Sequence, residues 1–267
     1  MYKLLVLDMD GTLLKKDKTI SCENLEAIKA AKLKNIKIAL ATGRPIKGIQ
    51  KYLQQLNLLT ENDYAVTFNG AIIQNTKTHK IVEQNLITLD DVKYLYNLSK
   101  KLNVIMHVWT PNTCITAKLT PCAKLESCLN DVDIELKSPD KIDGSTPIAK
   151  VMFIEEESYL LEAMKKLPDK VYEKYTVFRS SPFFLEFLNK KTNKGHGVQV
   201  LSESLHIKRD EIICVGDASN DIQMIKYAGL GVAMGNGFSD VKEAADYITK
   251  SNQENGVAHV INKFILN

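Results

Sequence analysis

The stretch LLVLDMDGTL, residues 4–13, is the part of the sequence that decides the fold. Its first four residues are a short apolar run, which is typical of a strand buried on both faces of a parallel sheet. The run ends at Asp8, and a second aspartate, Asp10, comes just before Gly11. Two carboxylates spaced by one residue at a strand end can approach one cation, or one can attack while the other moves protons.

Four more apolar runs end in the same way, in a polar residue or a glycine turn. They predict strands over 36–41, 65–68, 212–215 and 230–234, which lead into Thr42-Gly43, Asn69-Gly70, Gly216-Asp217 and Gly235-Asn236-Gly237. Segments with helical spacing separate these runs, and the alternation predicts an α/β fold with a doubly wound parallel sheet. Because ligands of such sheets bind beyond the carboxyl ends of the strands, we expect these residues to converge on one site.

The middle of the chain breaks this rhythm. Amphipathic strands are predicted over 80–87, 104–109, 148–154, 172–179 and 183–188, with helices over 90–102 and 158–167. One-sided alternation of this kind is typical of an antiparallel sheet with helices on one face. The parallel pattern then resumes. We therefore predict a discontinuous core, residues 1–82 and 189–267, with an inserted α+β cap domain over 83–188.

Composition excludes several classes of protein. The chain has 267 residues, 45% of them hydrophobic, and a net charge of +3. No basic block suggests nucleic acid as a partner, and no apolar run approaches a membrane span or a signal peptide. The five cysteines contain no C-x-x-C pair, which indicates thiols in a reducing compartment rather than a disulfide framework. We expect a cytoplasmic protein, for which a monomer is plausible.

A second acidic cluster lies at residues 216–221, where Asp217 follows a predicted strand and Asp221 begins a helix. Together with Asp8 and Asp10 it places four carboxylates at one edge of the sheet, and their repulsion is costly unless a cation lies among them. A site of oxygen ligands without Cys or His favours a hard ion, so we predict Mg²⁺.

Lys194 contradicts the usual charge preference of helices. It lies where a helix begins, and a lysine at that position works against the helix dipole. Such an inconsistency indicates a place where an anion is held. With a cation, two carboxylates and the hydroxyl of Thr42, this lysine composes a phosphoryl-transfer site, in which an aspartate can form an aspartyl phosphate.

These residues resemble those of a known family. The chain is similar to the haloacid dehalogenase-like (HAD) hydrolase superfamily, in its Cof-type sugar-phosphatase branch with a type IIB cap. The resemblance rests on five motifs in the family's order: DMDGTL (8–13), ATGRP (41–45), FNGA (68–71), NKG (193–195) and GDASNDIQM (216–224). Each motif is a modest signal, but together they cover both halves of the predicted core.

The resemblance implies a role for each motif. Asp8 would be the nucleophile and Asp10 the general acid and then the general base, while Thr42 and Lys194 would hold the phosphoryl oxygens. The magnesium ligands implied are Asp8, Asp217 and the carbonyl oxygen of Asp10, with Asp221 supporting them. The residues expected to contact the substrate are Gly43, Arg44, Asn69, Asn220 and, in the cap, Ser180.

The activity expected is that of a Mg²⁺-dependent phosphatase acting on small phosphomonoesters such as sugar phosphates or related phosphorylated metabolites. A phosphomutase with the same core is the alternative that the sequence leaves open. A phospho-receiver module is a remote alternative, because Asp10 is placed to activate water and so shorten the lifetime that a receiver's aspartyl phosphate needs.

Overall fold

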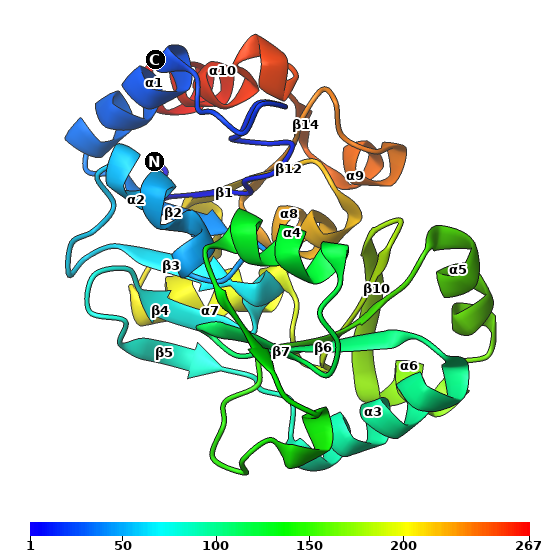
Figure 1. The fold of residues 1–267 in the computed structure, drawn as a ribbon. Helices are drawn as coiled ribbons and strands as arrows, with labels where there is room; N and C mark the ends of the chain where they lie inside the picture. Colours follow the sequence, from blue (N-terminus) through cyan, green and yellow to red (C-terminus); the bar gives the residue numbers. More distant parts are fainter. The chain divides into compact units, whose positions relative to one another are not determined.

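The computed structural model describes residues 1–267, and the chain forms two compact units (Figure 1). Unit 1 comprises residues 1–43, 50–84 and 193–267, and unit 2 comprises residues 44–49 and 85–192. The division into a core and a cap at residues 82/83 and 188/189 stays a prediction. No helix combines the length and the apolar character that crossing a bilayer requires.

Unit 1 is built on an eight-stranded sheet. In spatial order its strands are β14 (Tyr247–Ile248), β13 (Leu230–Ala233), β12 (Ile212–Gly216), β1 (Leu4–Leu7), β2 (Lys37–Ala41), β3 (Tyr64–Thr67), β4 (Ile72–Asn75) and β5 (Ile81–Gln84). The first six are parallel, and β4 and β5 add to one edge as antiparallel strands. Strand β1 is central, since Leu4 pairs with both Ile212 and Lys37. The predicted parallel α/β fold is confirmed.

Helices cover both faces of this sheet. Figure 1 shows α1 (Cys22–Leu33) and α10 (Gly256–Ile261) on one face, and α7 (Lys194–Ser204) and α8 (Ile222–Tyr227) on the other. Two further short helices, α2 (Gln50–Gln55) and α9 (Ser239–Ala244), complete the unit. On the second face, Val6 and Val66 pack with Val198 of α7 in one buried cluster. Burial of such a side chain contributes about 2 kcal/mol, so the packing fixes where the carboxyl ends of β1 and β12 lie.

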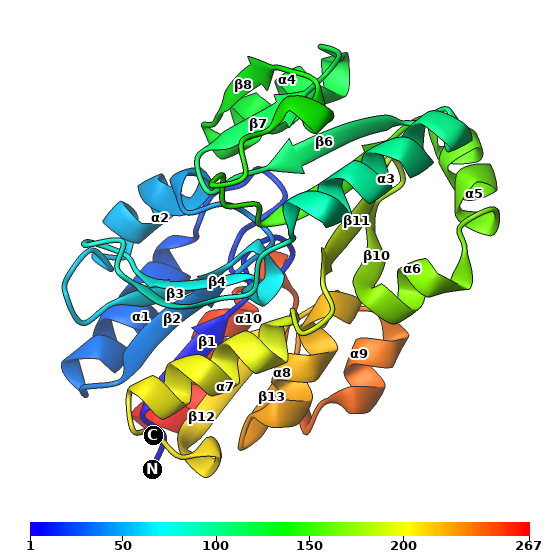
Figure 2. The ribbon, with the colours of Figure 1, turned by 90° about the horizontal axis from the view of Figure 1, so that it is seen from below.

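Unit 2 contains a six-stranded sheet. Its order is β10 (Tyr175–Ser181), β11 (Phe184–Asn189), β9 (Lys150–Ile154), β6 (Ile105–Trp109), β7 (Thr113–Thr116) and β8 (Asp133–Leu136). All neighbours are antiparallel except β7 and β8. Its helices are α3 (Leu89–Leu102), α4 (Pro121–Asn130), α5 (Glu157–Lys165) and α6 (Asp169–Lys174), and Figure 2 shows them from a second direction. Leu95 and Leu160 join α3 and α5 to Phe153 in a single core.

Two predicted strands differ from the structure. The segment 172–179 begins as helix α6, and the strand starts only at Tyr175, because Val171 anchors a short helix that follows Pro168. The segment 80–87 contains the strand β5, which belongs to the sheet of unit 1. As an exposed edge strand, β5 shows the same amphipathic pattern as a strand of a one-sided sheet.

Several elements were not predicted, among them β4 and β14 in unit 1 and a whole region of unit 2. Residues 113–136 form β7, α4 and β8, although α4 carries the usual signals of a helix start. The hydroxyl of Thr120 accepts a hydrogen bond from the backbone of Ala123, and Pro121 occupies the first helical position. Few of its side chains are buried, so the helix lacks the periodic apolar stripe on which a prediction depends.

Candidate active site

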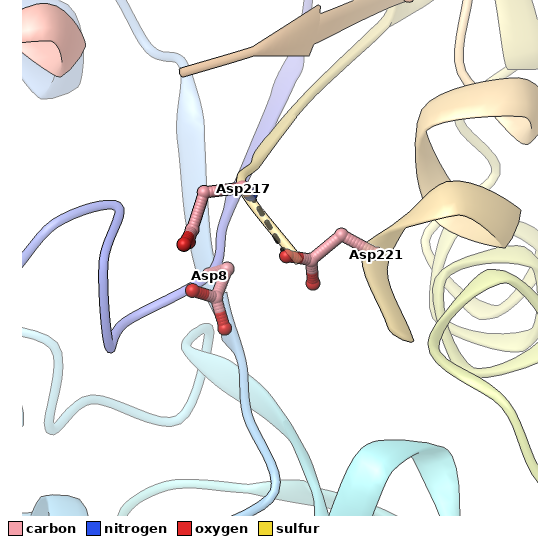
Figure 3. A group of neighbouring side chains, drawn as sticks. All are labelled: Asp8, Asp217 and Asp221. Carbon is pink, nitrogen blue, oxygen red and sulfur yellow. Dashed lines mark hydrogen bonds between the residues drawn. The ribbon is translucent and has the colours of Figure 1, made fainter. Parts of the chain in front are cut away.

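Three aspartates meet at the carboxyl edge of the sheet in unit 1. Asp8 follows β1, Asp217 follows β12, and Asp221 lies in the short 3-10 turn before α8. A carboxylate oxygen of each lies within 4.8 Å of the others. Figure 3 shows the three side chains gathered around one point. The structure thus brings together three of the four carboxylates that the strand-end pattern predicts at one edge.

Lys194 is the cation of this cluster. Its Nζ lies 2.6 Å from Oδ1 of Asp8 and 2.7 Å from Oδ1 of Asp221, and its side chain is only 1% exposed. The position follows from the start of α7, where the side chain of Asn193 accepts a hydrogen bond from the backbone of His196. Burial lowers the pKa of a lysine, but Asp221 and Asp8 together outweigh it, so the pKa of Lys194 is raised and the group stays charged.

The cluster carries more negative than positive charge. Three carboxylates lie close together and one ammonium group contacts two of them, which leaves an excess of two negative charges when all are ionised. Burial, followed by the charge of Asp221, raises the pKa of Asp8 well above its ordinary value. Burial likewise raises the pKa of Asp217 to about 6. A divalent cation would relieve this repulsion, and an all-oxygen donor set suits Mg²⁺.

Asp221 is engaged on both of its carboxylate oxygens. Oδ1 accepts from Lys194, while Oδ2 accepts from the backbone N–H groups of Asp217 and Ala218, each at 3.0 Å. The dashed line in Figure 3 marks the bond to Asp217. The side chain is fully buried. Asp221 therefore fixes the backbone that carries Asp217.

Gly11 and Thr12 close the site from the side of β1. The backbone of Gly11 has φ +94°, and a Cβ there would lie 2.2 Å from Oδ2 of Asp217, so the position requires glycine. The hydroxyl of Thr12 donates to Oδ1 of Asp217 at 2.7 Å. Thr12 belongs to a motif that the sequence analysis recognised, but no role was predicted for its side chain.

The carboxylate of Asp10 lies outside this cluster. Its Oδ1 is 2.7 Å from Nζ of Lys18, and the two side chains are 38% and 48% exposed. Lys18 has φ +63°, which is unusual for a residue with a side chain, and the hydroxyl of Tyr52 donates to its carbonyl oxygen at 3.0 Å. Sequence analysis missed Lys18, because it lies in the lysine-rich run 15–18, which has no periodicity to distinguish one lysine from another.

Thr42, Asn69 and Asn220 form a second group at the same edge. The carbonyl oxygen of the buried Thr42 accepts from the backbone of Asn69 at 2.8 Å. The Oδ1 of Asn69 accepts from Nδ2 of Asn220 at 2.9 Å. Phe68 and Asn69 both have positive φ, a strained pair of the kind that collects at functional sites. A Cβ on Gly43 would lie 3.0 Å from Nδ2 of Asn69, so the turn is tightly packed.

Two of the expected substrate contacts lie in unit 2. Arg44 belongs to the short segment 44–49 of that unit, and Ser180 is an exposed residue of β10. The remaining predicted residues lie in unit 1. The side chains of unit 1 by themselves provide what a phosphoryl group needs: a carboxylate near a fixed ammonium group, and an excess of carboxylates suited to a cation.

The chain is similar over almost its whole length to proteins that are named as phosphatases. Residues 5–261 match the family model for haloacid dehalogenase-like hydrolases. A Bacillus subtilis (strain 168) protein named "Putative phosphatase YxeH" is 41% identical over 100% of this chain and 99% of its own length. A second protein of that strain, the 5-amino-6-(5-phospho-D-ribitylamino)uracil phosphatase YcsE, is 31% identical over 99% of this chain and 96% of its own length.

Solved structures show the same relationship. A haloacid dehalogenase-like hydrolase from Bacteroides thetaiotaomicron superposes with a TM-score of 0.90 at 34% identity, over 99% of this chain and all of the other. The subclass IIB sugar phosphatase BT4131 superposes with a TM-score of 0.82 at 26% identity, over 98% of each chain. The resemblance inferred from the motifs is confirmed, and the chain belongs to the haloacid dehalogenase-like hydrolases.

Proposed function

We propose that this chain is a Mg²⁺-dependent phosphatase that hydrolyses small phosphomonoesters through an aspartyl phosphate on Asp8. The observation that carries the proposal is the cluster of Asp8, Asp217 and Asp221, in which the ammonium group of Lys194 contacts Asp8 and Asp221. The names of the relatives support the reaction class, since YcsE is named for a phosphorylated ribitylamino-uracil and BT4131 for sugar phosphates.

In the first half of the reaction, an oxygen of Asp8 attacks phosphorus and the bond to the leaving oxygen breaks. Asp10 supplies the proton that the leaving oxygen takes up. In the second half, Asp10 accepts a proton from water, the water oxygen attacks phosphorus, and the bond to Asp8 breaks to release inorganic phosphate. Lys194 and Thr42 would hold the phosphoryl oxygens, and Lys194 already lies 2.6 Å from the attacking group.

Mg²⁺ would be held by carboxylate oxygens of Asp8 and Asp217 and by the backbone carbonyl of Asp10. Bound there, it would neutralise charge on the transferred phosphoryl group. Asp221 would support these ligands rather than coordinate the ion itself, because both of its oxygens already accept hydrogen bonds. We propose that it orients Asp217 and Lys194.

The substrate class is proposed on the family resemblance. Sugar phosphates or related phosphorylated metabolites are the expected substrates, with residues 83–188 as the cap. Arg44 and Ser180 are proposed to contact the leaving group, and Gly43, Asn69 and Asn220 to line the phosphoryl side.

The test is a panel of phosphorylated metabolites assayed for phosphate release with MgCl₂ and with EDTA. We expect release from at least one sugar phosphate or related ester, and none in EDTA. Equal release in EDTA would disprove the metal requirement. A phosphomutase would instead transfer the group within a sugar phosphate, with little free phosphate and a requirement for a bisphosphorylated activator, so each active substrate is assayed with and without one.

A further inference from the structure

The loop after β13, residues 235–237, was expected at the site edge but has no role in the reaction above. Its central residue, Asn236, uses both ends of its side-chain amide. Nδ2 donates to the carbonyl oxygen of Gly11 at 2.8 Å, and Oδ1 accepts from the backbone N–H of Asn252 at 2.8 Å. The side chain therefore bridges the turn after β1 and the segment that follows β14.

Asn252 extends the same connection. Its buried side chain donates from Nδ2 to the carbonyl oxygen of Leu14 at 2.7 Å. The turn that carries Asp8 and Asp10 is thus held at two carbonyl groups, those of Gly11 and Leu14, by two asparagines that are distant in sequence. Loss of the buried Asn252 amide would leave the carbonyl of Leu14 unpaired, which makes that contact costly to lose. Asn236 is exposed, so its contribution lies in joining Gly11 to the backbone of Asn252.

The loop also holds the opposite side of the proposed metal site. The backbone N–H of Phe238 donates to the carbonyl oxygen of Asp217 at 3.0 Å, and a Cβ on Gly237 would lie 3.1 Å from that oxygen. One short loop therefore contacts both segments that carry the proposed metal ligands. The contact between these segments is close, because Thr12 donates to Asp217.

We propose that Asn236 is a positioning residue for the magnesium site. It fixes the separation of the turn at residues 8–14 from Asp217, so that oxygens on both segments stay placed for one ion. The inference rests on the proposed function, because it assumes that Mg²⁺ binds at Asp8 and Asp217. Groups that orient metal ligands in this way typically change metal affinity or activity by about 10-fold to 100-fold when removed.

The experiment measures Mg²⁺ binding directly. Isothermal titration of the metal-free full chain with MgCl₂ is compared for the wild type, Asn236→Ala and the control Asn62→Ala. Asn62 is an exposed asparagine of unit 1 that precedes β3. It therefore lies at the amino ends of the parallel strands, opposite the carboxyl ends that carry the site. We expect Kd to rise about 10-fold in Asn236→Ala and to be unchanged in Asn62→Ala. With p-nitrophenyl phosphate at a fixed, subsaturating MgCl₂ concentration, kcat should fall while KM changes less than about twofold, since Asn236 holds the metal side of the site.

The two asparagines should act as one unit. The variant Asn252→Ala is therefore combined with Asn236→Ala, and the loss of Mg²⁺ affinity in the double variant should be smaller than the product of the single losses. If Asn236→Ala unfolds without metal, Asn236→Ser is titrated in its place with the same expectation. A wild-type chain that binds no Mg²⁺ would disprove the proposed function. A wild-type chain that binds Mg²⁺ with the same Kd as the folded Asn236 variant would overturn only this inference.

Discussion

The two units each bury a lysine against a carboxylate, with different consequences. In unit 1, Lys194 is 1% exposed and bonds to Asp8 and Asp221. In unit 2, Lys150 is 6% exposed and lies 3.1 Å from Glu186, which is 4% exposed. By burial and distance alone, the two lysines would be judged alike.

Charge balance separates them. Lys150 meets one carboxylate and lies 5.4 Å from the ring of Trp109, so the pair in unit 2 is neutral and has an aromatic neighbour. Lys194 contacts Asp8 and Asp221, and Asp217 lies beside them, so the cluster is negative when all three carboxylates are ionised. A buried ion pair is therefore weak evidence for a site. An unbalanced cluster at the carboxyl edge of a parallel sheet is stronger evidence, because its repulsion is relieved only when it takes up protons or binds a cation, and the raised pKa values of Asp8 and Asp217 reflect their burial and that repulsion.

The largest effect should follow from Asp8→Asn. We expect kcat for p-nitrophenyl phosphate to fall roughly 10³-fold or more, because an amide does not attack phosphorus. The metal-free variant should still fold, since it loses one of three mutually repelling carboxylates. Asp133→Asn, an exposed position on β8 of unit 2, provides the same chemical change as a control. Wild-type turnover in Asp8→Asn would show that the charge imbalance does not mark the nucleophile.

The neutral pair of unit 2 should behave as a structural element. Lys150→Met is expected to lower the free energy of unfolding by about 3–5 kcal/mol, because it leaves the Glu186 carboxylate buried without a partner. The double variant Lys150→Met/Glu186→Leu should recover most of that loss in urea unfolding. The matching test in unit 1 should give the opposite result. The single variant Lys194→Met should lose turnover of p-nitrophenyl phosphate, and the double variant Lys194→Met/Asp221→Asn should not regain it. Equal instability of the single and double variants at Lys150 would contradict the distinction between the two lysines.

His107, on β6 in unit 2, should give that unit a pH dependence of its own. Burial, with a smaller contribution from Lys150, lowers the pKa of His107 to about 4, and neither ring nitrogen has a hydrogen-bond partner. The unfolded chain binds this proton below about pH 6.5, whereas the folded chain binds it only below about 4. Stability is therefore lost as the pH falls through this window, by about 3 kcal/mol in total.

Urea unfolding between pH 4 and 7 measures this loss. His107→Leu should remove the contribution, while a change at the exposed His206, made as His206→Asn, should keep it. If the free energy of unfolding of His107→Leu falls with decreasing pH as steeply as that of the wild type, burial does not exclude the protonated form of His107.

The smallest effect is expected at Lys18→Gln. The pair with Asp10 is 2.7 Å long but more than a third exposed on both sides, so solvent screens it. The free energy of unfolding should change by less than about 1 kcal/mol in urea unfolding. A larger loss would show that this exposed ion pair contributes as much to stability as a buried one. Lys18→Arg, which keeps the positive charge, would then be expected to restore the stability.

The sequence predicted the parts of the molecule in which local pattern and global fold agree. Apolar runs such as residues 4–7 are buried strands, and the polar residues that follow them lie at one edge. Topology alone brings Asp8 and Asp217 together, because β1 and β12 are parallel neighbours. The parallel fold and the convergence of the carboxylates were therefore predictable before any contact was known.

Contacts that depend on the reach of one side chain were not predictable. Lys18 and Thr12 contact Asp10 and Asp217 through turns whose geometry has no periodic signal. Asn236 was placed at the correct edge, but its bonds to Gly11 and Asn252 depend on three loops meeting at once. The hydrogen bonds to both carboxylate oxygens of Asp221 were likewise not predictable, because two of the donors are backbone N–H groups, whose positions depend on the fold of the loop.

The pairing of β1 with β12 also determines when the site can form during synthesis. Thr12 and Asp217 touch although 205 residues separate them in the chain. The strands of unit 2 all lie before residue 190, so all of them leave the ribosome before β12 does. Contacts this distant in sequence close slowly, because the loop entropy must be overcome first. The repulsion among Asp8, Asp217 and Asp221 therefore arises only when β12 pairs with β1, after all strands of the other sheet have been synthesised. It does not oppose the earlier steps of folding.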